Sequence, residues 1–203
     1  MKDFLDSDLI YHAKQIFPFC RSLTGIGNRK TLDHFESFNS DFLRLKFETG
    51  EKVFDWNIPK EWNIYDGYIE HIDTGKRYAL FKELNLHILG YSQPINKVVN
   101  KEELLEHIYT EPSEPKNVPY VTSFYKKNWG FCLSQEQKDS LPNGLYKVFI
   151  DSKLENGYLD MSHAIIKGYS NKEIFFSSNI CHPSMVNNEL SGPIVLNGLL
   201  NYI

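Results

Sequence analysis

The sequence lacks closely spaced cysteine pairs, long apolar runs and the pattern of a secretory signal. Its three cysteines form no Cys-x-x-Cys pair, which argues against a disulfide framework or a zinc ribbon. No apolar run approaches the roughly 18 residues that a membrane-spanning helix needs. The first ten residues carry acidic side chains where a secretory signal would have basic and then apolar ones. We therefore expect a cytoplasmic protein with no membrane partner.

The chain also has fewer basic than acidic residues. The 203 residues contain 22 Lys and Arg against 26 Asp and Glu, which gives a formal net charge of −4. Nucleic acid is not an expected partner, because its recognition depends on clustered positive charge and the chain has no basic stripe. Aromatic residues are abundant, at 14%, and this indicates a chain rich in strands and ring-lined surfaces.

The hydrophobic pattern changes twice along the chain. Residues 3–17 have the spacing of an amphipathic helix, and Leu43, Leu45 and Phe47 alternate as in a strand. From about residue 50 the chain consists of short strand-like pieces. Residues 110–119 contain three prolines and no periodicity, which is typical of a connector. The pattern therefore places domain boundaries near residues 50 and 119.

Polar residues gather between two predicted elements near the end of the chain. Residues 173–180 are apolar and continuous enough for the central strand of a covered sheet, and a helix is predicted from Ser191, with Ser191 as its N-cap. Ligands of open α/β sheets bind at the carboxyl ends of strands. Several side chains there are therefore candidates to bind a metal or a substrate: His182, Asn187, Asn188, Glu189 and Ser191. A polar loop with a helix cap is the simpler interpretation of the same residues.

Six motifs carry a family resemblance, and they occur in a fixed order: Phe17–Gly25, Val53–Asn63, Asn85–Ser92, Pro119–Tyr125, Trp129–Cys132 and Cys181–Ser184. In this they resemble the bacterial aminopeptidase-like DUF4910 family with an inserted DUF2172 segment, which is distantly similar to zinc aminopeptidases of the M28 type. The resemblance implies an α/β fold with a zinc-peptidase-like core at residues 1–49 and 119–203, interrupted by a small β-rich domain at residues 50–118. It also implies a core that is incomplete at the C-terminus, because the family's later ligands and its glutamate base would lie beyond Ile203.

The same resemblance assigns metal ligands. The last motif of that family usually resembles His-Pro-Ser-x-x-Asn-Asp-Asn-x-Ser-Gly, in which the histidine is a zinc ligand and the aspartate bridges two zinc ions. It implies that His182 is a metal ligand and that Asn188 stands where the bridging aspartate would be. A neutral amide has one oxygen and no charge, so it cannot replace that bridge. Glu189 is the expected substitute, and zinc is the expected cofactor.

Two further interpretations concern Arg21, Ser22 and Cys181. Arg21 and Ser22 lie in a glycine-containing turn and could bind an anionic group of the substrate, although the commoner role of such an arginine is to tie a loop to a helix end. Cys181 beside His182 raises the idea of a thiol hydrolase. Adjacent residues at a strand end point to opposite sides, so we expect a buried structural thiol instead.

The sequence thus predicts the N-terminal portion of a metal-dependent, aminopeptidase-like hydrolase that cleaves an amide bond in a peptide or an amino-sugar-like small molecule. Its catalytic residues are not assigned. The 203 residues alone are expected to be inactive, and to form an oligomer or to pair with a C-terminal partner segment. The alternative is a non-catalytic binding or scaffold module that keeps the fold and has lost its metal site. Carbohydrate binding by the aromatic insert rests on composition alone.

Overall fold

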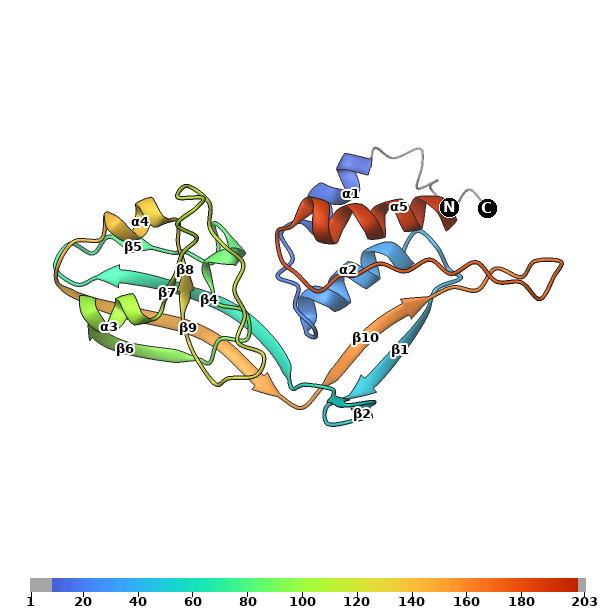
Figure 1. Cartoon of the computed structure of the whole chain (residues 1–203), viewed down its shortest axis with the longest axis horizontal. Coiled ribbons are helices and arrows are strands. Elements are labelled where there is room, and N and C mark those ends of the chain that lie inside the picture. Colours follow the sequence, from blue (N-terminus) through green and yellow to red (C-terminus); the bar gives the residue numbers. More distant parts are fainter. Residues whose placement is uncertain (1–8, 201–203) are drawn as a thin grey trace. The chain divides into compact units, whose positions relative to one another are not determined.

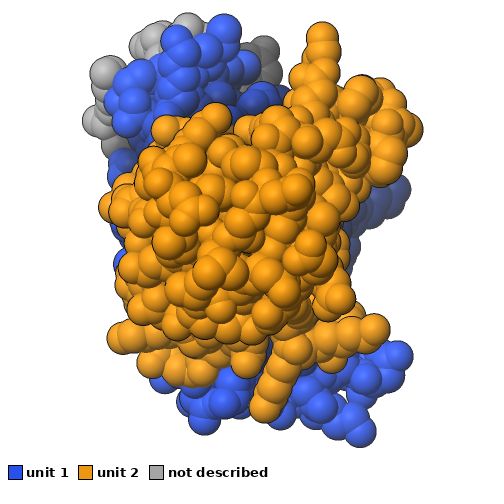
Figure 2. Space-filling model, turned by 90° about the vertical axis from the view of Figure 1, so that its left-hand side faces the viewer, with its two compact units in different colours: residues 1–61, 156–203 blue, residues 62–155 orange. Residues whose placement is uncertain are grey.

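The computed structural model describes residues 9–200, and its fold is mixed α/β, as predicted. The chain divides into two compact units, one of residues 1–61 and 156–203 and the other of residues 62–155 (Figure 1, Figure 2). Among the described residues, no helix has both the length and the apolar character needed to cross a membrane.

A four-stranded sheet forms the centre of the second unit, and its strand order is β5-β4-β9-β6. The bounds of its strands are β4 Glu61–His71, β5 Arg77–Tyr78, β6 Ile95–Asn100 and β9 Leu145–Glu155. Alternate side chains of β9, those of Tyr146, Val148 and Ile150, are buried, which is the period of two that a strand imposes. β6 pairs antiparallel with β9, from Ile95 opposite Ile150 to Asn100 opposite Leu145.

Short elements surround this sheet: the 3₁₀ turn Asn85–His87, α3 Lys101–Glu106, β7 Ile108–Tyr109, β8 Phe131–Cys132 and α4 Gln135–Asp139. β7 and β8 pair in parallel. The capping box at the start of α4 is present, because Ser134 Oγ accepts from the Gln137 amide and Gln137 Oε1 accepts from the Ser134 amide.

The second unit differs from the predicted insert at residues 50–118. It begins later, at residue 62, and it continues through residue 155. The physical reason is the pairing of β9, which lies between β4 and β6 in the sheet. The proline-rich stretch is therefore a connection within this unit, and the chain returns to the first unit only after β9.

The first unit combines helices with a two-stranded ribbon: α1 Leu9–Ile16, α2 Ile26–Glu36, β1 Leu43–Glu48, β2 Lys52–Val53, β3 Trp56–Asn57, β10 Tyr158–His163, a π-helical turn Val186–Leu190 and α5 Ser191–Leu200. β1 and β10 are antiparallel, with Leu43 opposite His163 and Glu48 opposite Tyr158. A hydrophobic cluster lies where the helices meet and contains the buried side chains of Ile16, Phe35, Leu190 and Ile194.

The central strand expected at residues 173–180 is not formed. This segment is extended, and it pairs with no strand in the described part of the chain (Figure 1). The side chains of Ile174 and Phe175 are 84% and 87% exposed. A strand needs a neighbour for its backbone hydrogen bonds, and the strand pairs of the first unit, β1 with β10 and β2 with β3, do not include it.

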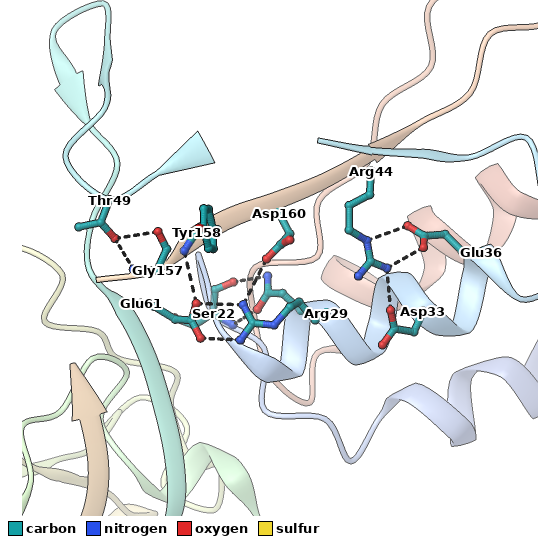
Figure 3. Close-up of polar contacts among 11 residues, drawn as sticks. Ser22, Arg29, Asp33, Glu36, Arg44, Thr49, Glu61, Gly157, Tyr158 and Asp160 are labelled. Atoms are coloured by element: carbon teal, nitrogen blue, oxygen red, sulfur yellow. Dashed lines mark hydrogen bonds and ion pairs between the residues drawn. The ribbon is translucent and has the colours of Figure 1, made fainter. Parts of the chain in front are cut away.

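Arg29 of α2 connects three parts of the first unit (Figure 3). Its guanidinium donates to both carboxylate oxygens of Glu61, at 2.9 and 2.5 Å, and to Asp160 Oδ2 of β10 at 3.3 Å. The Glu61 and Asp160 side chains are 8% and 1% exposed. Two buried carboxylates therefore share one arginine, and the bidentate geometry fixes the orientation of the pair with Glu61.

We predict that Arg29→Met lowers the free energy of unfolding by about 2 kcal/mol. The expected loss is smaller than the roughly 3–5 kcal/mol that removal of one partner of a fully buried pair costs, because the Arg29 side chain is 29% exposed. Urea denaturation followed by circular dichroism measures it. The control is Arg77→Met, which removes the exposed pair with Glu70 and should leave the urea midpoint nearly unchanged. Equal effects of the two variants would contradict the prediction.

A histidine pair connects α1 and α2. Nδ1 of His12, which is fully buried, lies 2.9 Å from Nε2 of His34. Burial, and then the neighbouring His12, lower the pKa of His34 to about 4. In the unfolded chain the pKa is close to the ordinary value of about 6.5. Between these values the unfolded chain binds the extra proton, so stability is complete above about pH 6.5 and is lost as the pH falls toward 4.

The melting temperature should therefore fall more steeply between pH 6.5 and pH 4.5 in the native chain than in a His34→Gln variant. The glutamine cannot take up a proton, whereas the carboxylates that also titrate there are the same in both proteins. Thermal melting at half-unit pH intervals measures both slopes. Identical slopes would show that His34 is not the responsible group.

Candidate metal centre

The candidate site lies in the first unit, in residues 181–190, between the extended segment 173–180 and α5. Ser184 in this loop has a φ of 53°, in the left-handed region that residues other than glycine rarely adopt. The chain turns sharply there and then enters the π-helical turn Val186–Leu190. This turn brings Glu189 back beside the residues that precede it.

Three side chains with metal-binding atoms meet at this turn. Cys181 Sγ lies 3.3 Å from His182 Nδ1 and 3.6 Å from Glu189 Oε1, and Nδ1 of His182 is hydrogen-bonded to the same Oε1. The three ligand atoms all lie within 4.8 Å of one another. The structure thus brings together the predicted residues His182 and Glu189.

The expectation that Cys181 points away from His182 is wrong. It relied on the alternation of side chains along a strand, and residues 173–180 are not part of a sheet. Without that constraint both side chains turn to the same side. The sequence contained the adjacent pair Cys181-His182, but nothing in it indicated this departure from strand geometry.

Asn188 lies outside the cluster. Its side chain is exposed, and its Nδ2 is 3.7 Å from Sδ of Met185. Consecutive residues on a helical turn point in different directions, so Asn188 and Glu189 cannot both face His182. Glu189 takes the inward position, with its side chain 1% exposed. Ser191 is not an N-cap, because the helix already includes the preceding turn, and its hydroxyl donates to the carbonyl of Asn187 at 2.7 Å.

Arg21 holds this loop against α1. The residue is 1% exposed, and it donates from Nε to the carbonyl oxygen of His182 at 3.0 Å and from a terminal nitrogen to that of Ile16 at 2.5 Å. This geometry is that of an arginine that ties a loop to a helix end. The substrate-binding role suggested for Arg21 and Ser22 stays a prediction.

Asn28 is a residue whose role the sequence did not reveal. Its side chain accepts from the Ser22 amide at 2.9 Å and donates to the Ser22 carbonyl at 2.6 Å and to the Ile180 carbonyl at 3.2 Å. The amide thus fixes the backbone next to Arg21 and the backbone next to Cys181. Asn28 lies within α2, which begins at Ile26.

The electrostatics of the site follow from burial. Burial lowers the pKa of Arg21 to about 10, against the opposing effect of Glu189. Burial, and then the Glu189 carboxylate, raise the pKa of Cys181 to about 11, so the thiol is protonated at neutral pH in the metal-free protein. Glu189 Oε2 is buried and has no hydrogen-bond partner among the described residues, which leaves one carboxylate oxygen open to a further ligand.

The arrangement fits a cation better than a thiol-based relay. In a nucleophilic triad one ring nitrogen of the histidine contacts the nucleophile and the other contacts the acid. Here Cys181 and Glu189 both contact Nδ1. Imidazole, carboxylate and thiolate groups are common ligands of zinc, so the donor set fits the metal that the resemblance implies.

The contribution of Glu189 to the thiol can be measured. Glu189→Gln removes the negative charge next to Cys181, so the pKa of the thiol should fall and its alkylation by iodoacetamide at pH 8 should become several-fold faster. Mass spectrometry distinguishes Cys181 from Cys20, which is also partly buried, and from the buried Cys132. Asn188→Ala is the matched control and should leave the rate unchanged. A slower or unchanged rate in Glu189→Gln, with the other two cysteines still protected, would show that the carboxylate does not raise the pKa of the thiol.

Comparisons with known proteins give a consistent result. Residues 61–153 match the family model of a domain of unknown function, DUF2172. This range nearly coincides with the second compact unit, residues 62–155. The DUF2172 part of the resemblance is therefore confirmed, with bounds that differ from the predicted 50–118.

The remaining similarity is to proteins described as peptidase-like. A Clostridium acetobutylicum protein named "Putative polysaccharide biosynthesis protein with aminopeptidase-like domain" is 43% identical over 179 residues, which are 88% of this chain and 41% of that protein. The "Crystal structure of putative peptidase" from the same organism matches with a TM-score of 0.91 and 40% identity, over 96% of this chain and 46% of that one. The chain thus spans less than half the length of either relative. The assignments to DUF4910 and to M28-type enzymes stay predictions.

Proposed function

We propose that this chain is part of a metal-dependent, aminopeptidase-like hydrolase in which His182 and Glu189 are metal ligands. The observation that carries the proposal is the direct contact between the imidazole and the buried carboxylate, with one carboxylate oxygen still open. The similarity to proteins described as peptidase-like supports the same reaction class.

The proposal assigns roles to three residues of the site. His182 and Glu189 hold the cation, and Arg21 keeps the His182 backbone in place through its carbonyl oxygen. A zinc ion bound there would polarise a carbonyl oxygen and lower the pKa of a bound water. A hydrolase also needs a general base, for which the described residues provide no assigned candidate. Turnover is therefore proposed for the whole protein and not for these 203 residues.

The proposed scissile bond is an amide. Peptides contain it, and so do N-acylated amino sugars, which are components of many polysaccharides. The relative's name combines polysaccharide biosynthesis with an aminopeptidase-like domain, and an amide on an amino-sugar precursor would satisfy both parts of that name. Peptides and amino-sugar-like small molecules are the two substrate classes to test.

The experiment uses the whole protein to which this proposal assigns turnover. It compares hydrolysis of aminoacyl anilides and of N-acylated amino sugars before and after chelation, in the native protein, His182→Ala and Asn188→Ala. We expect activity that chelation abolishes and zinc restores, with a loss of about 100-fold or more in His182→Ala because a ligand is missing. Asn188→Ala should keep most of the activity.

Two results would overturn the proposal. One is hydrolysis that survives both chelation and His182→Ala. The other is a folded, metal-loaded protein that hydrolyses neither substrate class, which would favour the non-catalytic binding or scaffold module. Metal content by elemental analysis separates this second result from simple loss of the ion.

A further inference from the structure

The side chain of Cys181 has an unusual position for a structural thiol. Its sulfur contacts two polar ligand atoms, Nδ1 of His182 and Oε1 of Glu189, at 3.3 and 3.6 Å. A buried structural thiol packs mainly against apolar groups and behaves as a small hydrophobic side chain. This sulfur is instead directed at the two atoms that the proposed function assigns to a metal.

The distances match those of a zinc-class coordination shell. Metal–ligand bonds of about 2.0–2.3 Å in a tetrahedron place neighbouring ligand atoms roughly 3.3–3.8 Å apart. Both sulfur distances fall in this range. Nδ1 of His182 and Oε1 of Glu189 are closer to each other than this, as a hydrogen-bonded pair is, and they would have to move apart by about 1 Å when a cation replaces the shared proton.

Charge balance favours the thiolate as a ligand. Arg21 is a buried cation that interacts with Glu189, so with Glu189 as its only anionic ligand the site would keep the full charge of a divalent ion uncompensated. Buried charge is costly unless it is offset. Asn188 cannot supply the missing negative charge, because it is neutral and faces away from the cluster. A Cys181 thiolate adds a second negative charge from within the cluster and lowers the uncompensated charge by one unit.

The geometry points to Cys181 as the third ligand of a site for one thiophilic divalent cation of the zinc class, together with His182 and Glu189. The inference rests on the proposed function for the latter two residues and adds the sulfur. On binding, the S–H bond breaks, the proton leaves to solvent and the sulfur–metal bond forms. The His182 side chain is 28% exposed, so the fourth position of the metal can be reached by water or a substrate.

The test is titration of the 203-residue chain with Co²⁺ under reducing conditions and without chelator. Cobalt reports on its ligands: a thiolate gives an intense charge-transfer band in the near ultraviolet, and tetrahedral geometry gives visible bands. We expect both in the native chain. Cys181→Ser should lose the near-ultraviolet band and bind at least about tenfold more weakly. Cys20→Ser and Cys132→Ser are matched controls that should keep the band.

A second measurement needs no variant and holds even if Cys181→Ser fails to fold. One equivalent of Zn²⁺ should slow the alkylation of Cys181 in the native chain, because a bound thiolate is less available to the reagent. Alkylation of Cys181 at the same rate with and without bound Zn²⁺ would overturn the inference.

The outcomes separate the two proposals. If Co²⁺ binds without a thiolate band and its binding is lost in His182→Ala, the inference on Cys181 is wrong and the metal ligand of the proposed function stands. If the thiolate band is present but the whole protein of the proposed function hydrolyses no amide, the site stands and the proposed function fails. If Co²⁺ does not bind to the chain at all, the inference on Cys181 is wrong.

Discussion

The buried carboxylate of Glu189 is the constraint on which the rest of the first unit depends. A carboxylate that is 1% exposed needs compensation by positive charge or hydrogen bonds. The chain provides the imidazole of His182 and the nearby guanidinium of Arg21. Because Arg21 is also bonded to the His182 and Ile16 carbonyls, the compensation of one charge fixes the loop, the end of α1 and the inward direction of the π-helical turn. The candidate chemistry and the packing of this region therefore share the same contacts.

The two compact units differ in what they contribute to the candidate site. The range that matches DUF2172, residues 61–153, nearly coincides with the unit built on the four-stranded sheet. The three candidate ligands belong to the other unit and lie within residues 181–189, whereas Arg21 and Asn28, which contact the backbone there, come from a segment far away along the chain. In that unit two arginines connect α2 to the β1–β10 ribbon (Figure 3). Arg29 of α2 pairs with Asp160 of β10 and with Glu61. Arg44 of β1 pairs with Asp33 and Glu36 of α2. These ion pairs fix the position of α2, and Asn28 of α2 is hydrogen-bonded to the backbone next to Cys181.

Local signals made part of this structure predictable. The spacing of Ser134 and Gln137 and the alternation from Leu43 to Phe47 depend only on neighbouring residues. The capping box forms and a strand forms at Leu43–Glu48, although the side chains of Leu43 and Leu45 are exposed. The proximity of His182 and Glu189 followed from the idea of a polar loop before a helix. Long-range pairing was not predictable: the apolar run at 173–180 has the composition of a strand but no partner among the described residues. Cys181 contacts His182 and Glu189 because the segment before it is unpaired. Glu189 points inward because of a π-helical turn, which has no clear signature in the sequence.

The central claim is that this turn places three ligand atoms around one cation. A crystal of the chain grown with one equivalent of Zn²⁺, measured at the zinc absorption edge, tests it most directly. We predict a single strong anomalous peak, at about 2.0–2.3 Å from His182 Nδ1, a Glu189 carboxylate oxygen and Cys181 Sγ. An ordered loop in which His182 and Glu189 remain hydrogen-bonded to each other, with the zinc peak elsewhere or at Asn188, would contradict it.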